Sequence, residues 1–424
     1  MIHVVFDTGK PADRVLAAHF RENKKYGSAD RRMISELYFS VLRWWGWLRH
    51  FPGGDARSAA DGARIASAPE WLAVLYSAAL LDRLPAERTL GVWHPILRSS
   101  YKLPYLVTPL PEDNLVAGRL LCRWFKVNSG IVVPENLVPE WIWQELPDCN
   151  REKLFDSWQR RPPLWLRAQN GCRDSLIADL ATHDLEAQAL SHHDNALALY
   201  NARPNLYQLP SFRAGRFEVQ DLASQVIGLS CNAKPGQRWW DACAGAGGKS
   251  LQLGAMMENS GNVVASDIRE YKLLDLKKRA RRSKLHNIRC KPWAGRRIPV
   301  QSANFDGVLV DAPCTCSGTW RRNPDARWTT PATELDEIST LQLDILNRAH
   351  AAVRPGGRLV YATCSLCRQE NETVTEAFLA EHPQFELAPL PHPLTGESTS
   401  GMLRVWPYDA DCDGAFVAVM QREK

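Results

Sequence analysis

Two cysteines in the C-terminal part of the chain follow largely apolar runs that are typical of buried strands. The run 305–310 leads into Asp311-Ala-Pro-Cys314, and the run 359–361 leads to Cys364. Because parallel strands of one sheet end at the same edge, both thiols and the carboxylate of Asp311 are expected to meet there. A thiol that neighbouring groups activate can act as a nucleophile, so this edge is a candidate for catalysis.

The residues alone leave three roles open for these cysteines. A cysteine in a reducing compartment is often only a small buried hydrophobe. Cys314-x-Cys316 and Cys364-x-x-Cys367 supply four sulfurs at nearly the spacing of a zinc site, although zinc would leave Asp311 without a role. In covalent catalysis, a thiolate adds to C6 of a pyrimidine, C5 then accepts a methyl group, and a base removes the C5 proton. Two thiols and an aspartate favour this third role.

A glycine-rich turn after an earlier strand is typical of a nucleotide site. The stretch 241–250 is DACAGAGGKS, whose three glycines let the backbone approach a ligand while the next helix offers unpaired N–H groups. A phosphate-binding P-loop would need a glycine where the chain has Cys243. Asp267 ends the next strand and can accept hydrogen bonds from both ribose hydroxyls, although capping of the next helix is an alternative. Together these features predict an adenosine-containing cofactor.

Strands and helices alternate from about residue 235 to the end of the chain. Strands are predicted at 238–243, 262–268, 304–313 and 357–364, and helices at 249–258, 272–284, 334–353 and 370–382. This alternation predicts an α/β fold, a Rossmann-like doubly wound parallel sheet with helices on both faces. The closing strands 402–408 and 415–423 are expected to add an antiparallel hairpin at an edge.

The spacing of apolar residues divides the rest of the chain into further parts. Residues 1–125 carry apolar residues at helical spacing and predict a helical domain, and residues 126–159 are expected to form a helical linker. Residues 160–232 predict a small α+β module, because two strand-like stretches enclose a helical one. Residues 233–424 hold the alternating sheet domain.

The composition is that of an ordinary globular protein, with 45% hydrophobic and 23% charged residues. The net charge is only +5, yet the segment 269–297 holds twelve Lys and Arg against Glu270 and Asp275. Such a patch suits a polyanion, although a solvated basic helix face is an alternative. Eleven scattered cysteines favour a reducing compartment, and no segment is apolar enough to span a membrane, so the cytoplasm is expected.

Several stretches match motifs of a known family in the family's order. They are FEVQDLASQ at 217–225, CAGAGGK at 243–249, Asp267, DAPCTCSGTWRRNPDARW at 311–328, YATCS at 361–365 and ENE at 370–372. Through them the chain closely resembles the RNA cytosine-C5 methyltransferases related to the bacterial small-subunit rRNA methyltransferase B, of the Sun/Nop2 group. The helical stretches PADRVLAAHF and RRMISELYFSVLR near the start resemble the NusB-like RNA-binding domain of that branch.

This resemblance implies S-adenosylmethionine as the cofactor and assigns roles to particular residues. The implied cofactor-binding residues are Cys243, Ala244, Gly245, Ala246, Gly247, Gly248, Lys249, Asp267, Ala294 and Asp311. Cys364 is implied as the nucleophile and Cys314 as the thiol that assists release of the methylated base. Asp311 is implied near the methionine amino group or the target cytosine, and no metal is implied.

The chain departs from the family pattern at two places. In the glycine turn, Gly245, Ala246 and Ser250 replace the usual Ala, Pro and Thr, and their small size keeps the turn feasible. After the third strand, the chain has Trp-Ala-Gly at 293–295 where the family tends to carry an acid near the adenine. Trp293 is expected to stack on the adenine instead.

The resemblance also implies a partner. RNA is expected, foremost ribosomal RNA with tRNA as an alternative, and we expect a monomer that does not bind membranes. The small module at 160–232 and the basic segment at 269–297 are expected to contact phosphates. A non-catalytic RNA-binding or ribosome assembly factor on the same fold is the alternative function.

Overall fold

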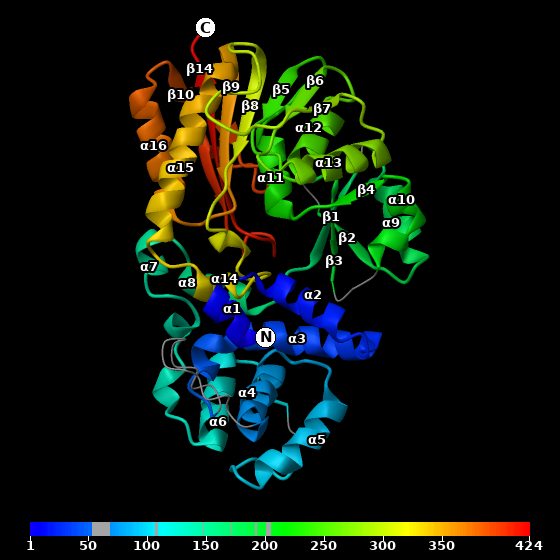
Figure 1. The fold of residues 1–424 in the computed structure, drawn as a ribbon, viewed down its shortest axis with the longest axis vertical. Helices are drawn as coiled ribbons and strands as arrows, with labels where there is room; N and C mark the ends of the chain where they lie inside the picture. Colours follow the sequence, from blue (N-terminus) through cyan, green and yellow to red (C-terminus); the bar gives the residue numbers. More distant parts are fainter. Residues whose placement is uncertain (53–67, 107–108, 147, 170, 191–192, 201–204) are drawn as a thin grey trace. The chain divides into compact units, whose positions relative to one another are not determined.

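The computed structural model describes residues 1–52, 68–106, 109–146, 148–169, 171–190, 193–200 and 205–424 (Figure 1). The chain divides into two compact units, of which unit 1 comprises Met1–Arg161 with Trp320–Pro331, and unit 2 comprises Pro162–Thr319 with Ala332–Lys424. The finer division into four parts made from the sequence stays a prediction. None of the helices in the described ranges combines the length and apolarity that a membrane crossing requires.

Unit 1 consists of helices in its described residues. They are α1 (Ile2–Thr8), α2 (Ala12–Glu22), α3 (Ser28–Leu48), α4 (Ala68–Leu81), α5 (Glu87–Arg98), α6 (Asn114–Phe125), α7 (Ile142–Glu145), α8 (Arg151–Gln159) and α14 (Ala326–Thr329), with the 3-10 turns η2 (Ser129–Ile131) and η3 (Pro134–Leu137). The predicted helical character of the first 125 residues is confirmed for the described part.

The core of unit 1 is built around α3, whose C-terminal half is almost entirely buried. Trp44 and Trp47 pack against each other there, with ring centroids 5.2 Å apart. The buried guanidinium of Arg43 pairs with Asp82, so the charge is compensated. The buried Arg327 likewise donates to the main-chain oxygen of Trp158, at 2.6 Å, which anchors α14 among the helices of this unit.

Unit 2 contains two larger sheets and the helices that cover them. Its helices are α9 (Arg173–Ala181), α10 (Pro210–Arg213), α11 (Leu222–Ser230), α12 (Gly248–Met256), α13 (Glu270–Arg282), α15 (Glu334–Ala349) and α16 (Glu372–Glu381), with η4 (Leu206–Gln208), η5 (Ser317–Thr319), η6 (His350–Ala352) and η7 (Arg368–Glu370). Its strands are β1 (Leu164–Ala168), β2 (Ala187–Ala189), β3 (Ala196–Leu199), β4 (Phe217–Val219), β5 (Arg238–Asp241), β6 (Asn262–Ala265), β7 (Ile288–Cys290), β8 (Phe305–Asp311), β9 (Val353–Thr363), β10 (Phe385–Leu387), β11 (Leu390–Pro391), β12 (Ser398–Thr399), β13 (Met402–Val405) and β14 (Ala415–Arg422).

The large sheet has the strand order β10-β14-β9-β8-β5-β6-β7. Strands β9, β8, β5, β6 and β7 pair in parallel, which confirms the predicted parallel core. The closing strands β13 and β14 pair antiparallel, as predicted. They do not form an edge hairpin, however, because β14 also pairs with β9 and with β10, which places it inside the sheet.

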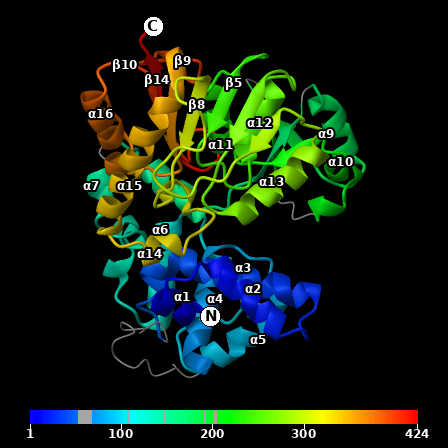
Figure 2. The same cartoon turned by 45° about the horizontal axis from the view of Figure 1, so that its top comes forward.

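Helices cover both faces of this sheet because successive strand residues point to opposite sides. Trp239 faces the side where α11 and α12 pack, and its neighbour Trp240 faces the side of α15 and α16. Figures 1 and 2 show α11 and α12 on one side of the strands and α15 and α16 on the other. The predicted doubly wound α/β fold is therefore confirmed.

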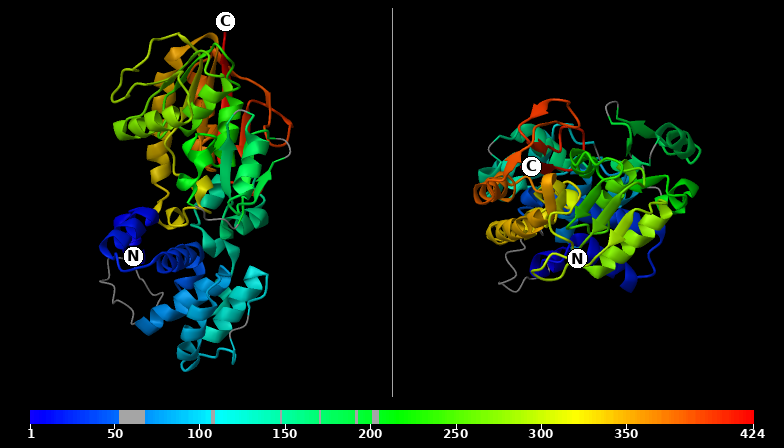
Figure 3. Two further views of the ribbon diagram at one scale, coloured as in Figure 1. Left: turned by 90° about the vertical axis from the view of Figure 1, so that its right-hand side faces the viewer. Right: turned by 90° about the horizontal axis from the view of Figure 1, so that it is seen from above.

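The small sheet has the order β2-β3-β1-β4 and is antiparallel throughout. Figure 3 shows the strands of this sheet in green tones within unit 2. At the end of α13, the guanidinium of Arg282 lies 3.8 Å from the ring centroid of Phe212 on α10. Glu218 on β4 is buried and accepts hydrogen bonds from Arg279 and Arg282 of α13. Two of the basic residues expected on a phosphate-binding surface are therefore engaged inside the protein.

Candidate active site

The glycine turn joins β5 to α12 and has one position that only glycine can occupy. Gly247 has a φ of +85°, and a Cβ there would lie 2.3 Å from Cγ of Leu276. At Gly245, where φ is +53°, a Cβ would meet nothing within 4 Å, so the turn opens into free space. Backbone N–H groups at the start of α12 and this open face fit the adenosine-containing cofactor that the sequence predicts.

Asp241 and Ser250 connect the two ends of this turn. Ser250 Oγ donates to Asp241 Oδ2 at 2.6 Å, and both residues are fully buried. Burial raises the pKa of Asp241 to about 7, although the bond from Ser250 acts in the opposite direction. The Ser250 that replaces the usual threonine therefore keeps the hydroxyl that this carboxyl group needs.

Asp267 lies beside the turn and is almost completely buried. It accepts hydrogen bonds from the backbone N–H of Gly245, at 2.8 Å, and from the backbone and guanidinium of Arg269. Burial raises its pKa, but these hydrogen bonds outweigh burial and leave the pKa below its ordinary value. Asp267 thus fixes the turn through Gly245 and also accepts hydrogen bonds from Arg269, the residue before α13. Ribose hydroxyls would have to displace the Arg269 side chain to reach this carboxylate.

Lys249 links the glycine turn to the strand that carries the cysteines. Its Nζ lies 2.8 Å from Oδ2 of Asp311, at the end of β8. Burial lowers the pKa of Lys249, but Asp311 and Cys364 outweigh it and raise the pKa above its ordinary value. Burial also raises the pKa of Asp311, against the pull of Lys249. A lysine ammonium group is therefore held against an acid and interacts electrostatically with Cys364.

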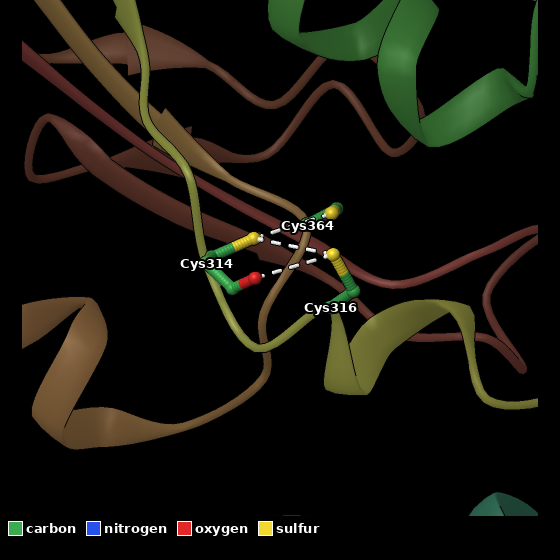
Figure 4. A group of neighbouring side chains, drawn as sticks. All are labelled: Cys314, Cys316 and Cys364. Carbon is green, nitrogen blue, oxygen red and sulfur yellow. Dashed lines mark hydrogen bonds between the residues drawn. The ribbon is translucent and has the colours of Figure 1, made fainter. Parts of the chain in front are cut away.

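The thiols of Cys314 and Cys364 meet at the carboxyl edge of the sheet, as the sequence predicts (Figure 4). Their Sγ atoms lie 3.3 Å apart because β8 and β9 are neighbouring parallel strands. Cys316 joins them, with its Sγ 3.9 Å from that of Cys314. Hydrogen bonds with Cys316 and Cys364, together with burial, raise the pKa of Cys314 well above its ordinary value.

The carboxylate of Glu370 holds the two cysteine-bearing loops together. Its Oε1 accepts from the backbone N–H of Thr315, at 2.8 Å, and from Nε2 of Gln342, at 3.0 Å. Its Oε2 accepts from the hydroxyls of Thr315, at 2.5 Å, and of Ser365. Sequence reasoning recorded the ENE motif at 370–372 without giving Glu370 this role. The sequence signal that could have indicated this role is the acidic Glu370 shortly after the strand predicted at 357–364.

The four-sulfur zinc site weighed from the sequence is not assembled. Among the residues that the structure describes, the thiols that come within 4.8 Å of one another are those of Cys314, Cys316 and Cys364. Cys367 is fully buried, and its sulfur lies 3.5 Å from Oγ of Ser317. The sulfur of Cys367 therefore belongs to the packing beneath the site.

Trp293 has a different place from the one expected. The residue is 8% exposed, and its ring packs against Trp240 with centroids 5.2 Å apart and faces the guanidinium of Arg348. The expected stacking on adenine is not supported, because Trp293 is part of the core between β5 and α15. Ala294 beside it is exposed, and its contact with the cofactor stays a prediction.

Comparisons with known proteins identify the family of the chain. The family model described as 16S rRNA methyltransferase RsmB/F matches residues 229–421. The ribosomal RNA small subunit methyltransferase B of Klebsiella pneumoniae is 33% identical over 296 residues, which cover 68% of this chain and 67% of that protein. The chain belongs to the RsmB/F family of 16S rRNA methyltransferases. The family resemblance, the enzyme class and the S-adenosylmethionine cofactor expected from the sequence are thereby confirmed.

Other members and structures extend the likeness to the rest of the chain. The probable ribosomal RNA small subunit methyltransferase B of Bacillus subtilis is 30% identical over 67% of this chain, which corresponds to 66% of that protein. The ribosomal RNA small subunit methyltransferase B of Erwinia tasmaniensis is 27% identical over 100% of this chain and 97% of its own length. The crystal structure of PH0851 covers 98% of this chain and 95% of its own at 24% identity, with a TM-score of 0.73. That structure supports the fold.

Proposed function

We propose that the protein methylates C5 of a cytosine in ribosomal RNA through a covalent bond between Cys364 and C6. The observation that carries the proposal is the 3.3 Å distance between the sulfurs of Cys364 and Cys314, at the strand ends beside the Lys249–Asp311 pair. Cysteines that served only as core packing would need neither an acid nor an ammonium group beside them.

Proton positions at the two thiols follow from their surroundings. Because the pKa of Cys314 is raised, Cys314 keeps its proton and can donate an S–H hydrogen bond to Cys364. The ammonium group of Lys249 also favours negative charge on Cys364. Both interactions stabilise the thiolate of Cys364, which is the nucleophilic form.

The reaction starts when a cytosine leaves its RNA structure and enters the site. The thiolate of Cys364 bonds to C6, and the electron pair of the C5–C6 bond makes C5 nucleophilic. Residues 243–249 of the glycine turn would hold S-adenosylmethionine, which would supply the methyl group that C5 accepts and would leave as S-adenosylhomocysteine. A base then takes the C5 proton, the S–C6 bond breaks, and the electron pair returns to the Cys364 sulfur. Asp311 binds the N3/N4 edge of the base, and Cys314 assists the elimination.

Paired cysteine variants test these roles. Cys364→Ala should abolish transfer of a labelled methyl group to a small-subunit rRNA transcript, while the RNA still binds. Cys314→Ala should slow release and trap a protein–RNA adduct on denaturing gels, and the double variant should form no adduct. Cys172→Ala, away from the site, serves as the control. Near-normal turnover of Cys364→Ala, or an adduct that depends on Cys314 instead, would overturn the assignment.

The family of the chain supports small-subunit ribosomal RNA as the substrate, with tRNA as the substrate to exclude. The exposed basic residues around α13 suit a phosphate backbone, so binding should weaken steeply with salt. They include Lys277, Lys278, Arg281, Lys284, Arg289 and Lys291. The expected compartment is the cytoplasm, and the expected state is a monomer. Bisulfite sequencing of RNA from cells with and without the protein should reveal one lost 5-methylcytosine in ribosomal RNA.

A further inference from the structure

A third thiol lies in the site, and the methyl-transfer mechanism does not use it. The Sγ of Cys316 is 3.9 Å from that of Cys314 and 3.3 Å from the main-chain oxygen of Cys314 (Figure 4). The neighbours of Cys316 have structural partners, since Thr315 contacts Glu370 and Ser317 contacts Ser365. Cys316 instead directs its sulfur towards the two catalytic thiols.

The backbone of Cys316 is held in an unusual conformation. Its φ is +59°, in the left-handed region that residues other than glycine rarely adopt. Such a conformation is energetically unfavourable and persists only where surrounding contacts impose it. The hydrogen bond from Gly318 N–H to the main-chain oxygen of Cys364, at 2.9 Å, is one of these contacts. The loop therefore presents the Cys316 sulfur at a fixed position.

The spacing of the three sulfurs suits a metal ion. A metal–thiolate bond of about 2.3 Å places sulfurs around one ion roughly 3.8–4.0 Å apart, in tetrahedral or trigonal geometry. The measured sulfur separations are 3.3 Å and 3.9 Å, and the three atoms lie within 4.8 Å of one another. A disulfide would require about 2.05 Å, so a bridging ion needs the smaller rearrangement.

We propose that Cys314, Cys316 and Cys364 form a binding site for one soft, thiophilic cation, such as zinc(II) or copper(I). When the ion binds, each thiol that still carries a proton releases it to solvent and forms a metal–sulfur bond. Thiolate ligands select soft cations and reject magnesium and calcium, which prefer oxygen. Lys249 offsets part of the excess negative charge of three thiolates. An ion here occupies the sulfur of Cys364 and therefore blocks its addition to cytosine.

Metal titration of the full-length protein tests the site without using activity. The reduced protein is titrated with cadmium(II), read by thiolate-to-metal absorbance, and with zinc(II) against a chromophoric chelator. The wild type should bind one ion tightly. Cys316→Ala should bind it at least 10–100-fold more weakly, since even loss of a supporting partner costs about that much. Cys172→Ala and Cys290→Ala remove cysteines elsewhere and should bind as the wild type does.

Equal affinity in Cys316→Ala and the wild type would overturn the proposal, as would the absence of tight binding in the wild type. The link to activity is a separate measurement, in which each variant is compared with its own metal-free rate. Zinc should inhibit methyl transfer by the wild type, a chelator should restore it, and Cys316→Ala should need at least 10-fold more zinc for the same inhibition. If the chain showed no methyl transfer at all, the titration would still decide the metal site.

Discussion

Replacing Glu370 with alanine should loosen both cysteine-bearing loops. The carboxylate accepts hydrogen bonds from the backbone N–H of Thr315, from Nε2 of Gln342 and from the hydroxyls of Thr315 and Ser365. Glu370 is fully buried, so bulk water does not replace these bonds. Alanine would leave two buried N–H donors and two hydroxyls without their acceptor.

The expected cost follows from these contacts. A buried donor that loses its partner costs about 1–3 kcal/mol, so Glu370→Ala should lower the local stability by about 3–5 kcal/mol. Glu370→Gln should cost less than about 1 kcal/mol, because Oε1 still accepts from both N–H groups. Its new NH₂ group can donate to the two hydroxyl oxygens, since a hydroxyl both donates and accepts.

Hydrogen exchange read by mass spectrometry over β8 and β9 measures this local stability. Turnover provides the second readout, and Glu370→Ala should lower kcat more than it changes the KM for S-adenosylmethionine, because Glu370 contacts the cysteine loops. Glu386→Ala, at an exposed position on β10, is the control. The reasoning fails if alanine and glutamine are equally harmful, or if alanine changes the opening free energy by less than about 1 kcal/mol.

Two further variants test the glycine turn. Asp241 keeps its proton up to about pH 7 in the folded state but loses it near pH 3.9 when unfolded, so the contribution of this carboxyl group to stability should fall as pH rises between these values. Asp241→Asn should remove this fall, which melting curves of the wild type and the variant at about pH 5 and about pH 8 would measure. If the two proteins showed the same pH dependence, the idea would be wrong. Gly247→Ala should cost about 1–3 kcal/mol and weaken S-adenosylmethionine binding in calorimetry, because of its φ and the contact with Leu276. Gly236 also has a positive φ, +84°, but open space surrounds it, so Gly236→Ala should leave binding of S-adenosylmethionine unchanged.

The sheet domain could be predicted because its signals are local. Each strand is a short apolar run, each helix follows at its own period, and the rule that parallel strands end at one edge brings Cys314 and Cys364 together. The glycine turn was recognisable for the same reason, since a tight approach needs glycine at particular positions such as Gly247. The position of β14 between β9 and β10 could not be predicted in this way, because strand order depends on partners far along the chain.

The charged residues of α13 show a second limit of the sequence. A run of Lys and Arg suggests a solvated or RNA-binding face, and only the tertiary structure shows that Arg279 and Arg282 turn towards the buried Glu218. Arg279 also donates to the main-chain oxygen of Ala246, so the small sheet and the glycine turn share one guanidinium group. The number of charged residues in a segment does not predict the direction in which each side chain points.

By itself, the sequence determined the α/β alternation, the glycine-rich turn and the placement of Cys314 and Cys364 at one edge of the sheet, because each depends on local patterns or on the rule that parallel strands end at a common edge. Tertiary structure alone decided that Glu370 joins the two thiol loops, that Cys316 completes a three-sulfur cluster, and that Trp293 belongs to the core. The physical reason is that hydrogen bonds and metal-ligand spacing act over a few ångströms between segments about fifty residues apart, and the folded backbone sets those distances.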